Sequence, residues 1–115
     1  MFGFEKLEVY KKGLAFVDLA FTISENLPVS LQSSCGDQLR RASLSIVNNI
    51  AEGSDQSSAK KKACFYEIAL HSARECIPVL TVIHNRNLLS LKDYSEGRER
   101  CAEICKMLVG LIKSC

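Results

Sequence analysis

The stretch LRRASLSIVNNIAEG, residues 39–53, decides the fold of this chain. Its apolar residues recur at steps of three and four, so that they line one face of a helix. They are Leu39, Ala42, Ile46 and Ile50. The pattern predicts a helix over residues 37–52, with Gly53 in the position of a left-handed C-terminal cap.

Three further helical patterns lie on either side of this stretch. They predict helices over residues 5–26, 59–86 and 91–113. Pro28 and the run 30–36 interrupt the first pattern, and no strand pattern competes with any of them. Four helices joined by short connections predict an all-α, up-down-up-down antiparallel four-helix bundle that occupies residues 1–115 as one domain.

Two details of these patterns carry expectations of their own. Pro78 falls inside the third helix, where it removes a backbone hydrogen bond and is expected to cause a kink. Ser90 followed by Asp93 resembles a capping box at the start of the fourth helix.

The first helix has two apolar stripes rather than one. The first stripe consists of Leu7, Tyr10, Leu14, Val17 and Phe21, and the second of Phe16, Ala20, Ile23 and Leu27. A single bundle needs to bury only the inner apolar stripe of each helix. The second apolar stripe therefore predicts self-association through a lateral helix face.

Composition agrees with one ordinary globular domain. The chain has 115 residues, of which 47% are hydrophobic and 24% charged, and its formal net charge is only +2. We identify neither a secretory signal nor an apolar stretch long enough to span a membrane, and therefore expect a cytoplasmic protein with reduced thiols.

The six cysteines show no Cys-x-x-Cys pair, which argues against a zinc knuckle or a thioredoxin-like motif. Helical spacing predicts that four of them are core residues: Cys64, Cys76, Cys101 and Cys105. Cys115 is terminal and is expected to be exposed.

A polar stripe runs beside the apolar one in the second helix. It consists of Arg41, Ser45, Asn49 and Glu52, and Ser72 and Glu75 share a face of the third helix. These six residues predict a hydrogen-bond network that fixes helix register, in which Arg41 pairs with Glu75 or Glu52. A ligand or catalytic pocket is the alternative.

The common catalytic and cofactor-binding motifs that we considered are not found in the sequence. The chain has no Glu-x-x-His motif of the kind that bundles use for di-iron sites, no Gly-x-Ser-x-Gly elbow and no phosphate-binding glycine loop. We therefore expect no metal, no cofactor and no enzymatic activity. An enzyme that uses His71, Glu75 and Glu52 remains the least favoured hypothesis.

Basic residues form two clusters. Arg40 and Arg41 lie in the first half of the second helix, and Lys60, Lys61 and Lys62 lie together at the start of the third. Lysines at a helix N-terminus oppose the helix dipole, which hints at an external reason for their placement. A ring of identical subunits would multiply such a patch into a basic belt that binds phosphate backbones.

The run 39–53 resembles the signature of the bacterial four-helix bundle family named after the 23S rRNA intervening sequence protein. Further matches are Phe4, Leu7 and Tyr10, the run 68–70 with Ser72 and Glu75, and the run 106–112. The chain departs from the family pattern at Tyr10, His71 and Pro78. A distant similarity extends to the accessory variability proteins of diversity-generating retroelements, which bind nucleic acid and a reverse transcriptase.

The resemblance implies a small cytosolic bundle that assembles as a homopentamer. With the basic clusters, it predicts a non-enzymatic accessory protein that binds RNA or DNA through Arg40, Arg41, Lys60, Lys61 and Lys62 without reading bases. The alternative is a scaffold for a protein partner encoded nearby.

Overall fold

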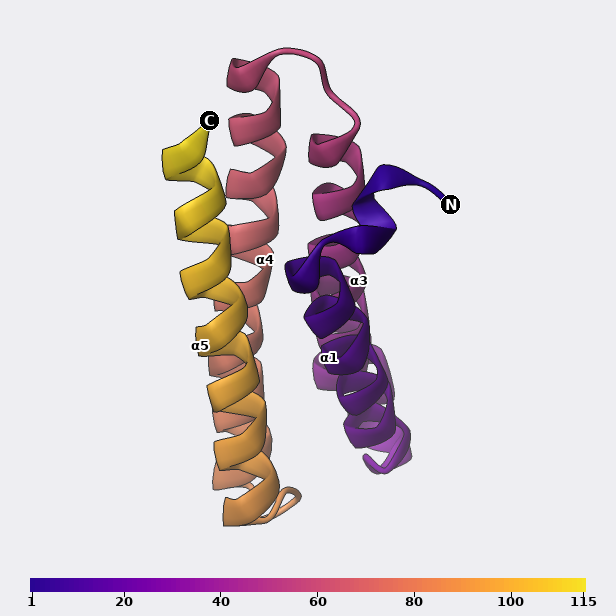
Figure 1. Cartoon of the computed structure of the whole chain (residues 1–115). Coiled ribbons are helices and arrows are strands. Elements are labelled where there is room, and N and C mark those ends of the chain that lie inside the picture. The colour runs from indigo at the N-terminus through magenta and orange to yellow at the C-terminus, as the bar shows by residue number, and fades with distance from the viewer.

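The computed structural model describes all 115 residues and contains four long helices, packed as an antiparallel bundle of 44 × 22 × 22 Å (Figure 1). They are α1 (Glu8–Glu25), α3 (Asp37–Ser54), α4 (Ala59–Asn85) and α5 (Leu91–Ser114). There is no strand, so the predicted all-α fold class is confirmed. None of the helices has an apolar stretch that could cross a membrane.

The first helix begins later than the sequence predicts. Gly3–Lys6 forms a separate 3-10 turn, η1, and Leu7 is extended before α1 begins at Glu8. This change of direction lets Phe4 meet Tyr10 edge to face, with ring centroids 5.0 Å apart.

The connection from α1 to α3 is helical almost throughout, although its sequence predicts a break over 30–36. A single α-turn, α2 (Val29–Leu31), leads into a π-helical turn, η2 (Gln32–Gly36), which continues directly into α3. The interruption is therefore confined to the residues around Pro28.

The prediction that Gly53 caps α3 in a left-handed conformation is wrong. No glycine has a positive φ, and α3 continues to Ser54. Lys62 supplies what the cap would have supplied, because its Nζ donates to the carbonyl oxygen of Ser54 at 2.8 Å and to that of Gly53 at 3.5 Å.

The remaining helix ends follow their sequence signals. Ser90 Oγ accepts from the backbone N–H of Asp93 at 3.1 Å, as the capping pattern predicts. α4 runs without interruption through Pro78, which lies on its exposed side. Asn87 ends α4 with φ of 62°, and the Leu88 N–H reaches back to the Ile83 carbonyl oxygen at 3.1 Å.

The core draws on all four long helices. Its largest fully buried apolar side chains are Phe16, Leu39, Ile46, Ile50, Leu80, Ile83, Ile104 and Leu108. The core uses the second apolar stripe of the predicted first helix, because Phe16, Ala20 and Ile23 of α1 and Leu27 just beyond it are buried, whereas Leu14 of the first stripe is 43% exposed.

The cysteines divide differently from the prediction. Cys76 and Cys101 are fully buried and Cys105 is half-buried, but Cys64 is exposed. Cys64 lies on the outer side of α4, one helical turn before the exposed Ile68, so its predicted core position is wrong. All six thiols are free.

Candidate functional site

The predicted polar network is much smaller than the sequence indicates. Ser45 of α3 and Ser72 of α4 place their Oγ atoms 2.7 Å apart. Asn49 Nδ2 donates to the Ser45 carbonyl oxygen at 2.8 Å and to its Oγ at 3.1 Å. These three half-buried or buried groups tie α3 to α4, which is the most extensive helix pair of the bundle.

The charged members predicted for this network lie outside it. Arg41, Glu52 and Glu75 are all exposed, and none of their side chains makes a hydrogen bond or an ion pair. The predicted pairing of Arg41 with Glu75 or Glu52 is therefore wrong. Solvation of three long side chains on the outer surface competes with pairing, because an exposed ion pair gains little free energy.

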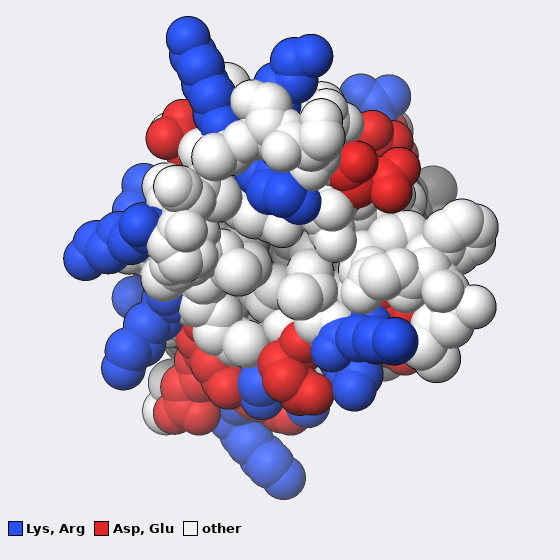
Figure 2. Space-filling model, turned by 45° about the horizontal axis from the view of Figure 1, so that its top comes forward, with Lys and Arg blue, Asp and Glu red and all other residues white.

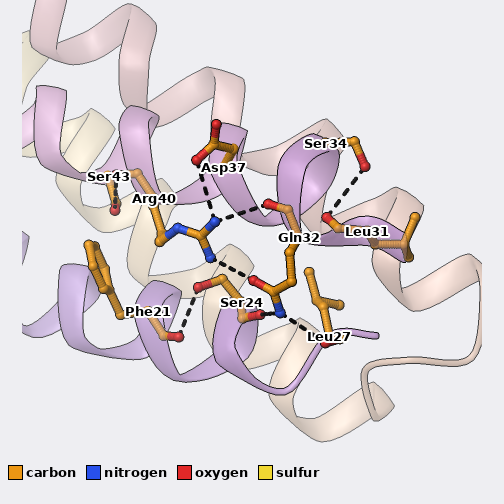
Figure 3. A network of polar contacts seen from close by, with 9 residues as sticks. All are labelled: Phe21, Ser24, Leu27, Leu31, Gln32, Ser34, Asp37, Arg40 and Ser43. Carbon is orange, nitrogen blue, oxygen red and sulfur yellow. Dashed lines mark hydrogen bonds and ion pairs between the residues drawn. The ribbon is translucent and has the colours of Figure 1, made fainter. Parts of the chain in front are cut away.

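Arg40 has a structural role rather than a free surface position. Its guanidinium donates to Gln32 Oε1 and to the Gln32 carbonyl oxygen, both at 3.0 Å, and lies 3.4 Å from Asp37 Oδ1. Figure 3 shows this side chain lying across the η2 turn. The Arg40 guanidinium is therefore not free to bind phosphate.

The side-chain amide of Gln32 also contacts the end of α1. Its Nε2 donates to the carbonyl oxygens of Ser24 at 2.7 Å and Leu27 at 2.9 Å, at the C-terminal end of α1 (Figure 3). Arg40 and Gln32 thus connect the end of α1 to the start of α3. The role of Gln32 could not be predicted from the sequence, since only the π-helical turn brings it beside both helices.

The three consecutive lysines have different roles. Lys62 is committed to the last carbonyl oxygens of α3. Lys60 and Lys61 are exposed and make neither a side-chain hydrogen bond nor an ion pair. They lie in the first turn of α4, where the helix dipole disfavours positive charge.

The lysine pair lies at the end of the bundle where α4 begins, which is turned toward the viewer in Figure 2. Lys and Arg side chains project around much of the rim of this face, and its centre is uncharged. Arg41 lies near the other end of α3, so it does not join the lysines within one copy. The aromatic neighbours Phe65 and Tyr66 pack against Gly53 instead of projecting from this face.

A second cluster, which the sequence analysis did not single out, lies at the opposite end of α4 and α5. Tyr94 Oη lies 2.9 Å from Thr81 Oγ1 and accepts from Arg98 at 2.9 Å, and these two contacts lower the pKa of Tyr94. The His84 ring stacks on Tyr94 with centroids 4.5 Å apart. His84 Nδ1 is 2.9 Å from the Leu89 carbonyl oxygen, so this ring also fixes the turn between the helices.

The least favoured candidate residues, His71, Glu75 and Glu52, are all exposed and form no common cluster. No group of three or more His, Cys, Asp or Glu side chains is placed to hold a metal ion. The surface depressions are shallow, and the one that includes Arg41 is lined otherwise by Ser33, Ser34, Asp37 and Gln38.

Comparisons with known proteins agree on one family. The family model of the 23S rRNA-intervening sequence protein matches residues 5–110. A crystal structure from Bacteroides thetaiotaomicron, described as a protein of unknown function from the S23 ribosomal protein family, is similar with a TM-score of 0.83 and 26% identity. The match covers 91% of this chain and 98% of that one.

No curated protein matches the chain. The family match nevertheless spans nearly its whole length, and it includes the α3 stretch from which the fold was predicted. The chain therefore belongs to the 23S rRNA-intervening sequence protein family.

Proposed function

We propose that this chain is a cytoplasmic, non-enzymatic accessory protein that assembles from identical copies, five by family resemblance, and binds nucleic acid through the phosphate backbone. One observation carries the proposal: Lys60 and Lys61 are exposed and unpaired in a helix position that costs free energy unless a negative partner is present. Arg40 and Lys62, by contrast, are bonded within the fold.

Self-association would increase the number of phosphates that the lysine pairs contact together. Two lysines per copy neutralise few phosphates, but several copies that present the same pair bind one polyanion together. The family names, which refer to 23S rRNA and to the S23 ribosomal protein family, support nucleic acid as the ligand class.

Base readout forms no part of the proposal. Tyr66 is buried and Phe65 half-buried against Gly53, so neither ring next to the lysines offers a stacking platform. Binding through phosphates alone is expected to depend on salt and to be indifferent to sequence.

The test compares Lys60→Ala/Lys61→Ala with the wild type for binding to mixed-sequence RNA and DNA at rising salt. The wild type should bind at about 50 mM salt and lose affinity linearly in the logarithm of salt concentration. The double variant should bind at least about tenfold more weakly and with a smaller salt slope, because fewer counterions are released.

Lys92→Ala/Lys106→Ala is the matched control, because it removes the same charge from exposed positions of α5. It should retain most of the wild-type affinity. Absence of wild-type binding at low salt, or equal losses in both double variants, contradicts the proposal.

A further inference from the structure

One aromatic ring of this chain stands in solvent. The chain has five phenylalanines and three tyrosines, and Phe2 alone among them is exposed, with 70% of its surface accessible. A single exposed apolar side chain is ordinary on a protein surface. The Phe2 ring differs from such a side chain because the structure also holds it in place.

Phe2 is the last member of a ladder of three rings that begins at the core. Tyr10 packs against the core, Phe4 meets Tyr10 edge to face, and Phe2 stacks on Phe4 with ring centroids 5.6 Å apart and planes 12° from parallel. The Phe2 backbone is fixed as well, because its N–H donates to Glu5 Oε1 at 2.8 Å and its carbonyl oxygen accepts from the Glu5 N–H at 3.1 Å. One face of the ring therefore lies on Phe4.

The ring lies at the same end of the bundle as the lysine pair, Lys60 and Lys61. The η1 turn packs against α1 and α3, and Figure 1 shows it beside the last turns of α3, which lead into the start of α4. A helix with its side chains is about 10–12 Å across, so the end of α3 is a short span for a flexible ligand. Lys6, in the last turn of η1, is exposed and belongs to no ion pair.

A flat ring beside free cations has the chemistry that binds single-stranded nucleic acid. The cations bind phosphates, and an aromatic ring stacks on any base, because every base has a π face. The bases of a duplex are already stacked on one another, whereas those of a single strand can be splayed out onto a ring. A duplex would therefore use the lysines and leave the ring in solvent.

We propose that the Phe2 ring stacks on an unpaired base of a single-stranded nucleic acid whose phosphates lie on Lys60 and Lys61. This inference rests on the proposed function and narrows its ligand from nucleic acid in general to single strands. It adds no base readout, because stacking tolerates every sequence and leaves the hydrogen-bonding edges of the base unread.

Abasic strands separate the ring from the lysines. A mixed-sequence single-stranded DNA of about 12 nucleotides, within the usual size of a single-strand site, is compared with an abasic strand of equal length and equal charge. The wild type should bind the intact strand about tenfold more tightly, as expected for one stacked base. Phe2→Ala, and Phe2→Leu, which keeps an apolar side chain without a flat ring, should bind both strands equally. Their salt slope should equal that of the wild type, because no cation is removed.

A fluorescence measurement observes the stacking directly. The chain has no tryptophan, so Phe2→Trp gives a signal from this position alone. The indole also offers a flat ring, so this variant should keep the wild-type affinity, and the intact strand should quench its fluorescence. Leu91→Trp is the matched control, because Leu91 is 67% exposed at the start of α5, at the opposite end of the bundle. Its fluorescence should not change.

The failure of this inference differs from the failure of the proposed function. Equal wild-type affinity for intact and abasic strands, or a Phe2→Trp variant that the intact strand does not quench, overturns the stacking. If Lys60→Ala/Lys61→Ala still weakens binding in that case, the proposed function stands without it. A response of Phe2→Trp to vesicles of anionic phospholipid but not to DNA also overturns the stacking and assigns the ring to a membrane surface. A wild type that binds no nucleic acid at low salt contradicts both.

Discussion

Gly53 shows how closely α3 and α4 approach each other. A Cβ atom built at this position would lie 2.8 Å from Cε1 and 2.9 Å from Cδ1 of Tyr66, and 3.1 Å from the Cβ of Phe65. The first two distances are shorter than any ordinary carbon contact. Glycine is needed here for space between helices, although its sequence position suggests a cap.

Replacement of Gly53 by alanine should therefore destabilise the protein by about 1–3 kcal/mol, as overpacking does. Gly110 is the matched control, because it also lies within a helix but nothing stands within 4 Å of its Cβ position. Gly110→Ala should stabilise α5 by about 0.5–1 kcal/mol through the higher helix propensity of alanine. Urea unfolding of both variants measures the difference, and equal effects would contradict the packing explanation.

Basic side chains were the least predictable at this scale. Arg40 and Arg41 are adjacent and chemically identical, yet one is bonded to Gln32 and the other projects from the surface. A change of one position rotates a helical side chain by about 100°, and the partner of Arg40 comes from a turn that the sequence does not reveal. The same holds for Lys62, whose partners are carbonyl oxygens.

The η2 turn is the element on which the first half of the bundle depends. It replaces an ordinary loop by continuous helix, and Arg40 with Gln32 adds side-chain hydrogen bonds to carbonyl oxygens of the π-turn and of the end of α1. π-helical turns are rare and need such specific partners.

Arg40→Ala should cost about 1.5–3 kcal/mol of unfolding free energy, because it removes charged hydrogen bonds and leaves Gln32 Oε1 without its donor. Arg41→Ala removes the same side chain one position later and should stay within about 0.5 kcal/mol of the wild type. Thermal unfolding under conditions where both variants are monomeric makes the comparison. A loss of equal size in the two variants would show that charge rather than the junction matters.

Element positions could be predicted well where periodicity was long and poorly where local geometry dominated. The helices expected over 59–86 and 91–113 agree with α4 and α5 to within one residue at each end. The start of α1 and the η2 segment were missed, because an aromatic contact and a side-chain network decide them. The two stripes of the first helix satisfy the same spacing, so spacing alone could not identify which one is buried.

For the molecule as a whole, buried acidic protons make the fold sensitive to alkaline pH. A hydrogen bond with the Cys76 thiol and burial raise the pKa of Cys101 far above the usual thiol range. Burial raises the pKa of Cys105 and of Tyr66 as well. The folded state therefore keeps protons that the unfolded chain gives up as pH rises.

Each such group contributes stability that is fully present below its unfolded pKa and is lost as pH rises above that value toward the folded pKa. Unfolding free energy should accordingly fall above about pH 8.5, by about 1.4 kcal/mol per pH unit for each fully shifted thiol. Cys101→Ala should be less stable at pH 7 because of its cavity, but its stability should fall less steeply between pH 8.5 and 10. Parallel pH profiles for the two proteins in urea titrations would contradict the assignment.

The family and the fold could be predicted from the sequence. The set of basic residues that could bind phosphate could not, because the structure shows that some of them are bonded within the fold. Of the five basic residues predicted to bind phosphate, Lys60, Lys61 and Arg41 are free, and Arg40 and Lys62 hold the backbone together. Whether a cation is free depends on the carbonyl oxygens around it, which only the packed helices bring into place.

Because Cys64 is exposed, a label attached to it can report ligand binding at the lysine pair. Cys64 follows Lys60 by four residues, so both lie on one face of α4, about one turn apart. Cys115 is exposed as well. After replacement of Cys115 by serine, a maleimide fluorophore would react selectively with Cys64, since the other thiols are at least partly shielded. A label on Cys64 would thus mark the end of the bundle where the lysine pair lies.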